Sequence, residues 1–327
     1  MNRIFKLAFC GLHIAATFVF FPGQAAAAEP YPCKTLMLVS PYPPGGTTDI
    51  LARLVAPGIA SSLGINVIVD NKGGASSNIG TEFVSRAQPD GCTALLGNNT
   101  GVVINRNLYP LRLDPVKSLA AVGAVASVPL LFYVNSSIPA KDMSELVKLI
   151  KATPGKYSYA SGGSGSPQHL AGELLKLERN VDILHIPYRG QGPAMTDVLA
   201  NQVPMAFETT TALMPHVNSG RLRVLATTAP KRVPGMPNVP TMKEAGFDNF
   251  VIENWYGVLV PAKTPPAMVA RLNEALNETL RSPQVKQKLV DMGSEDVSGT
   301  SEQFAKFIEQ ETPYWTNAVK RSGAKVD

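Results

Sequence analysis

The chain has 327 residues, of which 45% are hydrophobic and 17% are charged, and its formal net charge at pH 7 is +5. This composition is typical of a globular protein that is long enough to form two hydrophobic cores. Lysine and arginine are spread along the chain without a basic cluster, which argues against a nucleic-acid partner.

The first residues form a separate segment. A positively charged start at residues 2–6 is followed by an apolar run at residues 7–21 and by small residues at 25–28. This order predicts a secretory signal peptide over residues 1–28, cut after Ala26 or Ala28. A membrane anchor is the alternative, but the apolar run is short for a span and no later stretch could cross a bilayer. We therefore expect export to the periplasm as a soluble protein, with the formal charge reduced from +5 to +3 by loss of Arg3 and Lys6.

Two cysteines remain after the signal peptide. Cys10 lies within the apolar run, whereas Cys33 and Cys92 each stand just before a predicted strand. If these strands are neighbours in a parallel sheet, the two sulfurs can reach each other, and an oxidising compartment favours the bond. We predict a disulfide between Cys33 and Cys92.

Short strands alternate with helical patterns along the rest of the chain. Strands are expected at 35–40, 66–69, 93–96, 130–134, 156–160, 183–186, 203–207, 223–227 and 255–260. Helices are expected from Ile50, near 79–87, at 143–152, from Pro167, and in two closing segments at 265–281 and 301–322, with Pro57 kinking or ending the first. This alternation predicts an α/β fold in which each lobe is a mostly parallel sheet flanked by helices.

Two lobes are predicted. The chain is expected to cross between them near Val128–Pro129 and within residues 228–240, a proline-rich connector. The last segment has too few strands for a domain of its own, so it should return to the first lobe. Lobe 1 then comprises residues 29–128 and 235–327, and lobe 2 comprises residues 129–234.

Three turns share one pattern, in which a strand is followed by a glycine-rich loop and a helix start. They lie at residues 43–49, 72–80 and 161–169. Glycine lets backbone approach a ligand closely, and a helix N-terminus offers N–H donors and a positive dipole end to an anion. Such turns also need glycine for purely structural reasons, so each alone is ambiguous. Together they favour a site for a small carboxylate.

Other kinds of site have less support. No phosphate-binding loop is present, and His169, His185 and His216 lack the spacing of metal ligands, so we expect neither a metal nor a cofactor. A hydrolase could use Ser164 or Ser166 with His169, oriented by Asp182 or Asp197. The sequence around these serines is not Gly-x-Ser-x-Gly, however, and no catalytic residue is predicted.

Two further positions are ambiguous. Tyr188 opens another strand-to-helix turn that continues through Arg189 to Pro193, and Arg189 could bind a carboxylate or face solvent. Glu208 follows the strand at 203–207, at a strand end of the kind where open α/β sheets bind ligands. Its carboxylate would suit an N–H or hydroxyl group of a ligand, or it could cap the following helix.

Several segments together resemble the Bug family of periplasmic solute receptors, the binding components of tripartite tricarboxylate transporters. They span nearly the whole mature chain in the family's order: residues 41–49, 70–75 with 78–80, 89–91, 161–170, 188–193, 239–241 with 244–246, and 255–257 with 261–262.

The resemblance implies a two-lobed type II periplasmic-binding-protein fold, a Venus flytrap, that closes on a small carboxylate: a di- or tricarboxylate, an amino acid or an aromatic acid. Carried over to this chain, the expected ligand-binding residues are Tyr42, Gly45, Gly46, Thr48, Asp49, Ala75, Asn78, Ser161, Gly163, Gly165, Ser166, His169, Tyr188 and Glu208. The implied protein is a monomer that delivers its ligand to membrane transporter subunits. The alternatives are a ligand sensor for a two-component system with the same fold and a secreted serine hydrolase.

The chain departs from the family pattern near the expected pocket. Glu208 stands where an aspartate is common, and residues 98–101 replace a more usual small-residue and histidine pattern. These departures put the identity of the ligand in doubt, not the fold.

Overall fold

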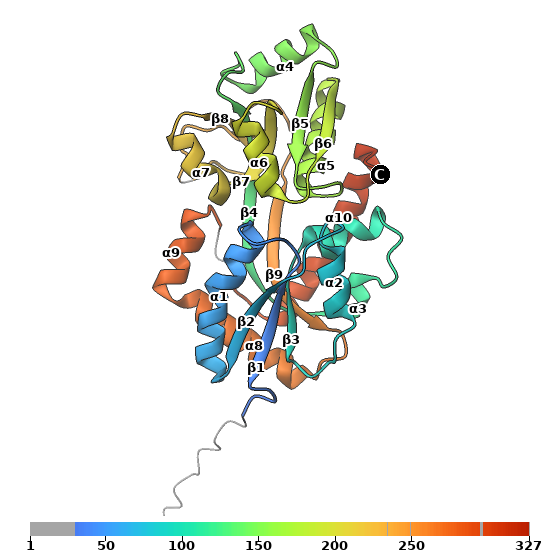
Figure 1. Ribbon diagram of the computed structural model, residues 1–327, viewed down its shortest axis with the longest axis vertical. Helices are drawn as coiled ribbons and strands as arrows, with labels where there is room; N and C mark the ends of the chain where they lie inside the picture. Colours follow the sequence, from blue (N-terminus) through green and yellow to red (C-terminus); the bar gives the residue numbers. More distant parts are fainter. Residues whose placement is uncertain (1–29, 234, 249, 295–296, 327) are drawn as a thin grey trace, which may run out of the picture. The chain divides into compact units, whose positions relative to one another are not determined.

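The computed structural model describes residues 30–233, 235–248, 250–294 and 297–326 (Figure 1). The predicted signal peptide, residues 1–28, lies outside this part of the chain. Residues 31–327 make up one compact unit. Among the described residues, no helix combines the length and the apolar character needed to cross a membrane.

Sheet A has the strand order β2-β1-β3-β9-β4. Its strands and the helices connected to them are β1 (Thr35–Ser40), α1 (Thr47–Leu63), β2 (Asn66–Asn71), α2 (Asn78–Ser85), β3 (Thr93–Asn98), the short helical turns η1 (Thr100–Ile104) and η2 (Asn105–Asn107), α3 (Pro115–Ser118), β4 (Leu119–Asn135), β9 (Glu253–Pro261), α8 (Pro266–Arg281) and α9 (Pro283–Asp291). Both faces of this sheet are covered. In β1, Leu36 and Leu38 belong to one apolar core while Val39 belongs to another, as the two-residue period of a strand requires.

Sheet B continues from β4 in the order β4-β7-β5-β6, and β8 also pairs with β4. Its elements are α4 (Met143–Ala152), β5 (Tyr157–Ser161), α5 (Pro167–Arg179), β6 (Ile183–Pro187), α6 (Gln191–Leu199), β7 (Met205–Thr209), α7 (Thr210–Asn218) and β8 (Leu222–Thr227). The C-terminal helix α10 (Ser301–Ser322) packs on β4 and α5.

Strand β4 belongs to both sheets. Its first part, Leu119 to Pro129, pairs with β9, and its last part pairs with β7 and β8. Figure 1 shows β4 and β9 side by side. The change of partners falls at Pro129, which has no N–H to donate, while the N–H of Leu130 donates to Thr228 Oγ1 over 2.9 Å. The crossing expected near Val128–Pro129 is therefore an uninterrupted strand, and the lobe limits at 128/129 and 234/235 stay a prediction.

The predicted α/β class is confirmed, but the sheets are mixed and not mostly parallel. In sheet A, β1 pairs in parallel with β2 and β3, whereas β9 pairs antiparallel with β3 and β4. In sheet B, β5 is parallel to β6 and β7, while β4 is antiparallel to β7 and β8. The antiparallel pairings of sheet A arise because β9 runs in the direction opposite to both β3 and β4. That long-range pairing leaves no local signal in the sequence.

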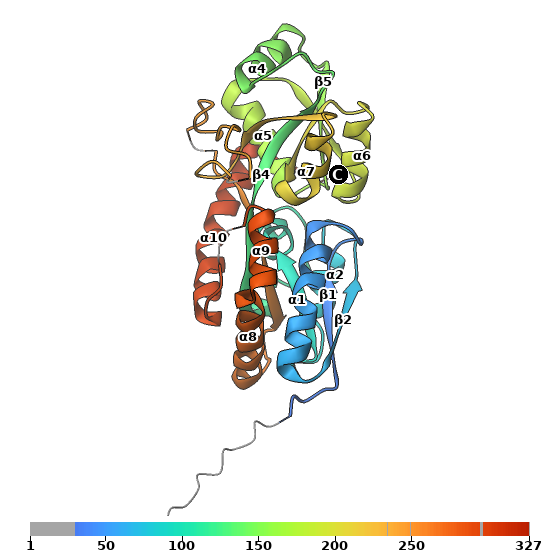
Figure 2. The same ribbon diagram turned by 90° about the vertical axis from the view of Figure 1, so that its left-hand side faces the viewer.

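The helices differ from the sequence expectation in two places. Helix α1 does not end at Pro57 but continues to Leu63, because it buries Leu51, Val55 and Ile59. Gly58 lets α8 approach it closely, since a Cβ there would lie 2.5 Å from the side chain of Thr279; Figure 2 shows α1 beside α8. The sequence interpretation also missed α9, although Ser282 caps it and proline follows at its first position.

Cys33 and Cys92 are joined by a disulfide in the structure, with their Cα atoms 6.1 Å apart. The strands that follow them, β1 and β3, are parallel neighbours, and the N–H of Met37 donates to the carbonyl of Cys92. The register of these strands thus brings together two cysteines separated by 59 residues.

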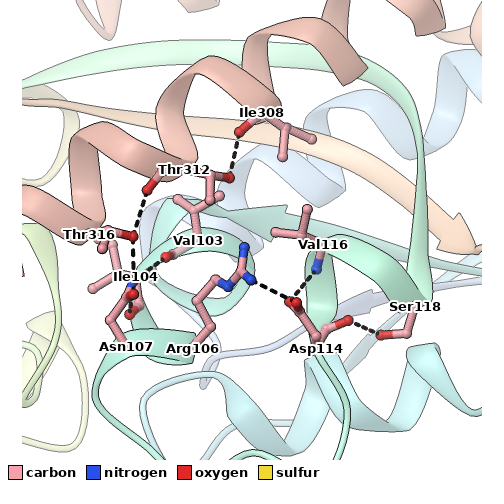
Figure 3. A network of polar contacts seen from close by, with 10 residues as sticks. All are labelled: Val103, Ile104, Arg106, Asn107, Asp114, Val116, Ser118, Ile308, Thr312 and Thr316. Atoms are coloured by element: carbon pink, nitrogen blue, oxygen red, sulfur yellow. Dashed lines mark hydrogen bonds and ion pairs between the residues drawn. The ribbon is translucent and has the colours of Figure 1, made fainter.

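Polar contacts connect α10 to the segment after β3 (Figure 3). Thr316 of α10 donates through Oγ1 to Asn107 Oδ1 over 3.0 Å. Nearby, Asp114 accepts the N–H of Val116 at the start of α3 and forms an ion pair with Arg106 at 2.7 Å. The C-terminal helix is thereby held to the lobe built on sheet A.

Candidate functional site

A cavity of about 190 Å³ is lined by residues from both sheets. The predicted binding residues that line it are Tyr42, Gly45, Gly46, Thr48, Ser166 and Glu208. Its walls come largely from turns that follow β1, β5 and β6, and from the end of β7. Carboxyl ends of strands in open α/β sheets are a common place for ligands.

One wall is the N-terminus of α1. Its N-cap residue, Gly46, has an extended backbone with φ −81° and ψ 167°, and no side chain caps the helix. Gly46, Thr47 and Thr48 line the cavity. The first amides of a 17-residue helix, with the positive end of its dipole, therefore border the cavity without a capping side chain.

Asp49 has a different position from the one predicted. It is buried but does not line the cavity. Its carboxylate accepts hydrogen bonds of 3.0 Å each from Gly45 N, Arg53 Nε and Asn71 Nδ2. Burial acts to raise the pKa of Asp49, but the hydrogen bonds from Arg53, Gly45 and Asn71 outweigh it and hold the pKa below its usual value. Asp49 thus stays ionised and fixes the turn that bears Gly46.

A second wall is the N-terminus of α6, in the strand-to-helix turn at residues 188–193 whose role the sequence left ambiguous. Its N-cap residue, Gly190, has φ 111°, a conformation that favours glycine, and again no side chain caps the helix. Arg189, Gly190, Gln191 and Gly192 line the cavity. This turn has the same order of strand, glycine and helix start as the turns at residues 43–49, 72–80 and 161–169, so the sequence pattern could have placed it with them. The predicted Tyr188 does not line the cavity, and its hydroxyl donates to Asp197 over 2.6 Å.

The turn before α5 contributes less than expected. Gly162, Ser166 and Gln168 line the cavity, but the side chain of Ser166 accepts the N–H of His169 and so caps this helix. The N–H of Gly165 donates to His169 Nδ1 over 3.0 Å. The N–H groups of Gly165 and His169 are therefore hydrogen-bonded within the protein, in contrast to the first amides of α1 and α6.

Gly163 and Gly165 instead belong to a contact between the two lobes. Ser76 Oγ donates to the carbonyl of Ser164 over 2.9 Å, and Tyr109 donates to the same carbonyl over 3.2 Å. A Cβ on Gly163 would lie 2.8 Å from Ser76 Oγ, and one on Gly165 would lie 2.8 Å from a methyl carbon of Leu108. These glycines permit the close approach of two chain segments.

Two more predicted residues lie beside this contact. Ala75 precedes Ser76 in the same left-handed turn, and Asn78 Oδ1 accepts a 2.7 Å bond from Asn105. Neither Ala75 nor Asn78 lines the cavity.

Ser161 and His169 lie in a buried aromatic cluster behind the turn. The Ser161 hydroxyl is 2.7 Å from His185 Nε2, and the His185 ring stacks on His169 at 3.9 Å between centroids. Burial, followed by the neighbouring His169, lowers the pKa of His185 to about 3, so His185 is neutral near pH 7. The prediction that His185 is a structural histidine agrees with this position. Neither Ser161 nor His169 lines the cavity.

Glu208 lies at the floor of the cavity, at the end of β7, and is only 1% exposed. Its Oε1 accepts hydrogen bonds from the backbone N–H and the hydroxyl of Thr209, at 2.6 and 3.0 Å. Burial raises its pKa to about 7, although the bonds from Thr209 act in the opposite direction. Thr209 also bonds to Thr47 across the lobes, at 3.0 Å between hydroxyls.

The remaining floor residues come from β3 and β9. Asn98 donates to the Tyr42 hydroxyl over 3.2 Å, and Asn254 donates to the Tyr256 hydroxyl over 2.9 Å. Asn98 lies in the segment where the sequence departs from the family pattern. Neither Asn254 nor Tyr256 was expected at the site, although Tyr256 lies in a segment that carries the family resemblance, because β9 reaches the site through its pairing with β3 and β4.

Two larger hollows, of about 430 and 470 Å³, lie against Trp255 and against Glu278. The first meets the start of α10, where Thr300 and Gln303 form a capping box. The second meets the start of α9, which Ser282 caps. Their helix N-termini are thus satisfied by side chains. Over the residues that the structure describes, no group of three or more histidine, cysteine or acidic side chains could hold a metal ion.

The stability of the protein is expected to depend on pH through Glu208. A buried carboxyl whose pKa rises from 4.5 to about 7 binds its proton more tightly in the folded state. Its contribution is fully present below pH 4.5 and is lost as the pH rises through 7, by an amount on the order of 3 kcal/mol. Urea unfolding across this range should show the loss in the wild type and a flatter profile in Glu208→Gln. Parallel profiles for the two proteins would contradict the prediction.

Comparison with known proteins gives consistent matches. Residues 51–324 match the model of the tripartite tricarboxylate transporter family receptor. Protein BugT of Bordetella pertussis is 34% identical over 328 residues, which cover 100% of both chains. The structure of the periplasmic binding protein BugD is 34% identical with a TM-score of 0.85, and that of Rhodopseudomonas palustris Rpa4515 with adipate is 31% identical with a TM-score of 0.87. Each covers 91% of this chain and 100% of the other, and these matches confirm the predicted two-lobed fold.

Proposed function

Because the chain belongs to the tripartite tricarboxylate transporter receptor family, we propose that it is an exported solute-binding receptor that closes on a small carboxylate. The observation that carries this proposal is the convergence of two uncapped helix N-termini on one cavity. The α1 terminus belongs to sheet A and the α6 terminus to sheet B. A ligand that reaches both would join the lobes.

The energetics of such a site suit an anion. One helix dipole favours an anion by roughly 0.3–1 kcal/mol, and a hydrogen bond to a charged group adds roughly 1.5–3 kcal/mol. Amides from both termini can therefore hold a carboxylate, with Arg189 contributing from the cavity wall. Since the ligand gains both sets of contacts only when the lobes are close together, it favours the closed state.

The location and partners follow from several features. The signal-peptide pattern of residues 1–28 supports export, and the Cys33–Cys92 disulfide suits an oxidising compartment. The relative BugD is a periplasmic binding protein. We propose a periplasmic monomer that delivers its ligand to membrane transporter subunits. A sensor for a two-component system remains the alternative, and pull-down of membrane partners distinguishes the two.

A serine hydrolase is less well supported. Ser166 lines the cavity, but its hydroxyl serves as the cap of α5. Ser161, which does contact a histidine, is fully buried and lies outside the cavity lining. The cavity therefore presents no serine paired with a general base at its wall among the described residues.

Ligand binding is tested by thermal unfolding of the mature protein with a panel of carboxylates and their neutral amides. A ligand at about 100 times its Kd stabilises the folded state by about 2.7 kcal/mol. For a protein of this size we expect a rise of several degrees with at least one acid and none with its amide. Lack of stabilisation by any acid, together with ester hydrolysis that Ser166→Ala abolishes, would instead support the hydrolase.

A further inference from the structure

The floor of the cavity presents acceptors that the protein itself leaves unused. Glu208 Oε2 and Asn254 Oδ1 are buried, and neither has a hydrogen-bond partner within the described part of the chain. Both residues line the cavity. Buried polar atoms are nearly always hydrogen-bonded in folded proteins, so two unpaired acceptors beside one cavity indicate the position of a donor.

The charges that line the cavity are also arranged asymmetrically. Arg189 and Glu208 are the charged side chains among its described lining residues. Arg189 follows β6 and Glu208 lies near the end of β7, and these strands lie on opposite sides of β5. With neighbouring strands about 4.8 Å apart, the backbones of β6 and β7 are about 10 Å apart. The cavity therefore has a basic residue and an uncapped helix start after β6, and an acidic residue at the end of β7.

We propose that the ligand is an aminocarboxylate, whose carboxylate lies at the N-termini of α1 and α6 and whose ammonium group donates to Glu208 and Asn254. This proposal rests on the proposed function and narrows its ligand class. An ammonium group carries several N–H donors, enough for both acceptors, and its charge complements that of an ionised Glu208.

A second carboxylate in the same position is disfavoured. It would place two acceptors, and at neutral pH two like charges, against each other in a buried site. Among the described residues, Tyr133 of β4 and Tyr256 of β9 also face Glu208, and burial raises the pKa of each well above its usual value, so both stay neutral and neither offsets the charge of a second carboxylate. The chain is thus expected to differ from the relative that was solved with adipate.

Matched ligand pairs test this proposal by calorimetry near neutral pH. The pairs are β-alanine with succinate, 4-aminobutanoate with glutarate, and 5-aminopentanoate with adipate, and the simple monocarboxylates of the same lengths serve as references. At the length that fits, the amino acid should bind at least about tenfold more tightly than both its dicarboxylate and its monocarboxylate, as the loss of one charge-assisted hydrogen bond implies.

Substitution at Glu208 separates a binding role from a structural one. Glu208→Gln should weaken aminocarboxylate binding by about tenfold or more and reduce the preference over the dicarboxylate. Glu253→Gln is the matched control, because Glu253 begins β9 next to Asn254 but lies outside the cavity lining. Titrations in buffers of different ionisation enthalpy should show proton release on aminocarboxylate binding to the wild type and none with Glu208→Gln. A merely structural glutamate would not give this signature.

The outcomes are distinguishable. If no carboxylate binds, the proposed function fails and this inference fails with it. If carboxylates bind, but the dicarboxylate is preferred or Glu208→Gln leaves the ranking unchanged, only the aminocarboxylate assignment is overturned. Preference for the aminocarboxylate that depends on Glu208 supports both.

Discussion

Replacement of Gly46 by valine is expected to reduce carboxylate affinity by at least about 100-fold, with only the small loss of stability in the free protein that a poorer N-cap residue brings. Gly46 is the N-cap residue of α1 and lines the cavity. Its backbone has an ordinary extended conformation, and a Cβ there would meet no atom within 4 Å. The side chain would therefore enter the ligand's space without strain. Loss of two hydrogen bonds of roughly 1.5 kcal/mol each corresponds to about 100-fold.

The matched control for this substitution is Gly235→Val. Gly235 is exposed, its added Cβ would also meet no atom within 4 Å, and it does not line the cavity. Calorimetry should show lost binding only in Gly46→Val, and thermal unfolding without ligand should be similar in both variants. Unchanged affinity in Gly46→Val would exclude the N-terminus of α1 as the carboxylate position. Gly163 is a poorer position for such a substitution. Its φ of 135° disfavours any side chain, and a Cβ there would collide with Ser76, so the substitution would strain the fold itself.

Removal of the Cys33–Cys92 disulfide is expected to lower the free energy of unfolding by about 4 kcal/mol. The bond joins residues separated by 59 positions. In the chain-entropy model, closure of a loop of this length contributes about 4 kcal/mol. Because the cysteines precede β1 and β3 and neither lines the cavity, ligand affinity should be almost unchanged in the folded variant.

Guanidinium unfolding of the oxidised protein, the reduced protein and the double variant Cys33→Ser/Cys92→Ser tests this prediction. The reduced protein and the double variant should unfold together, at lower denaturant than the oxidised protein. Thiol titration of the unreduced, denatured protein should find no free thiol in the mature chain. Two free thiols, or coincident unfolding of all three samples, would contradict the prediction.

The parts of the site that depend on one local turn could be predicted from the sequence. Residues 41–48 combine a strand end, glycines and a helix start within a few positions, and the structure places Tyr42, Gly46 and Thr48 at the cavity. The same pattern at 161–169 was less informative, because Ser166 caps its own helix. Whether a helix start is capped depends on side-chain geometry, which the spacing of glycines does not reveal.

The rest of the site depends on contacts between distant segments. Asn254 and Tyr256 face the cavity only because β9 lies between β3 and β4. In the same way, only residues 130–134 of β4 were predicted as strand. The preceding part of β4 includes Gly123 and Pro129, which disfavour strands locally, and it is held in the sheet by its pairing with β9.

The position of β9 also has a consequence for the order of folding. Sheet A cannot be completed while β9 is missing, because among the described strands β3 and β4 are joined only through it. β9 comes after all the strands of sheet B in the chain. As the chain is synthesised from its N-terminus, sheet B can assemble on the last part of β4 first, while the N-terminal strands wait for a late segment. The first lobe in the sequence is therefore expected to be the second to be completed, after β9 has emerged.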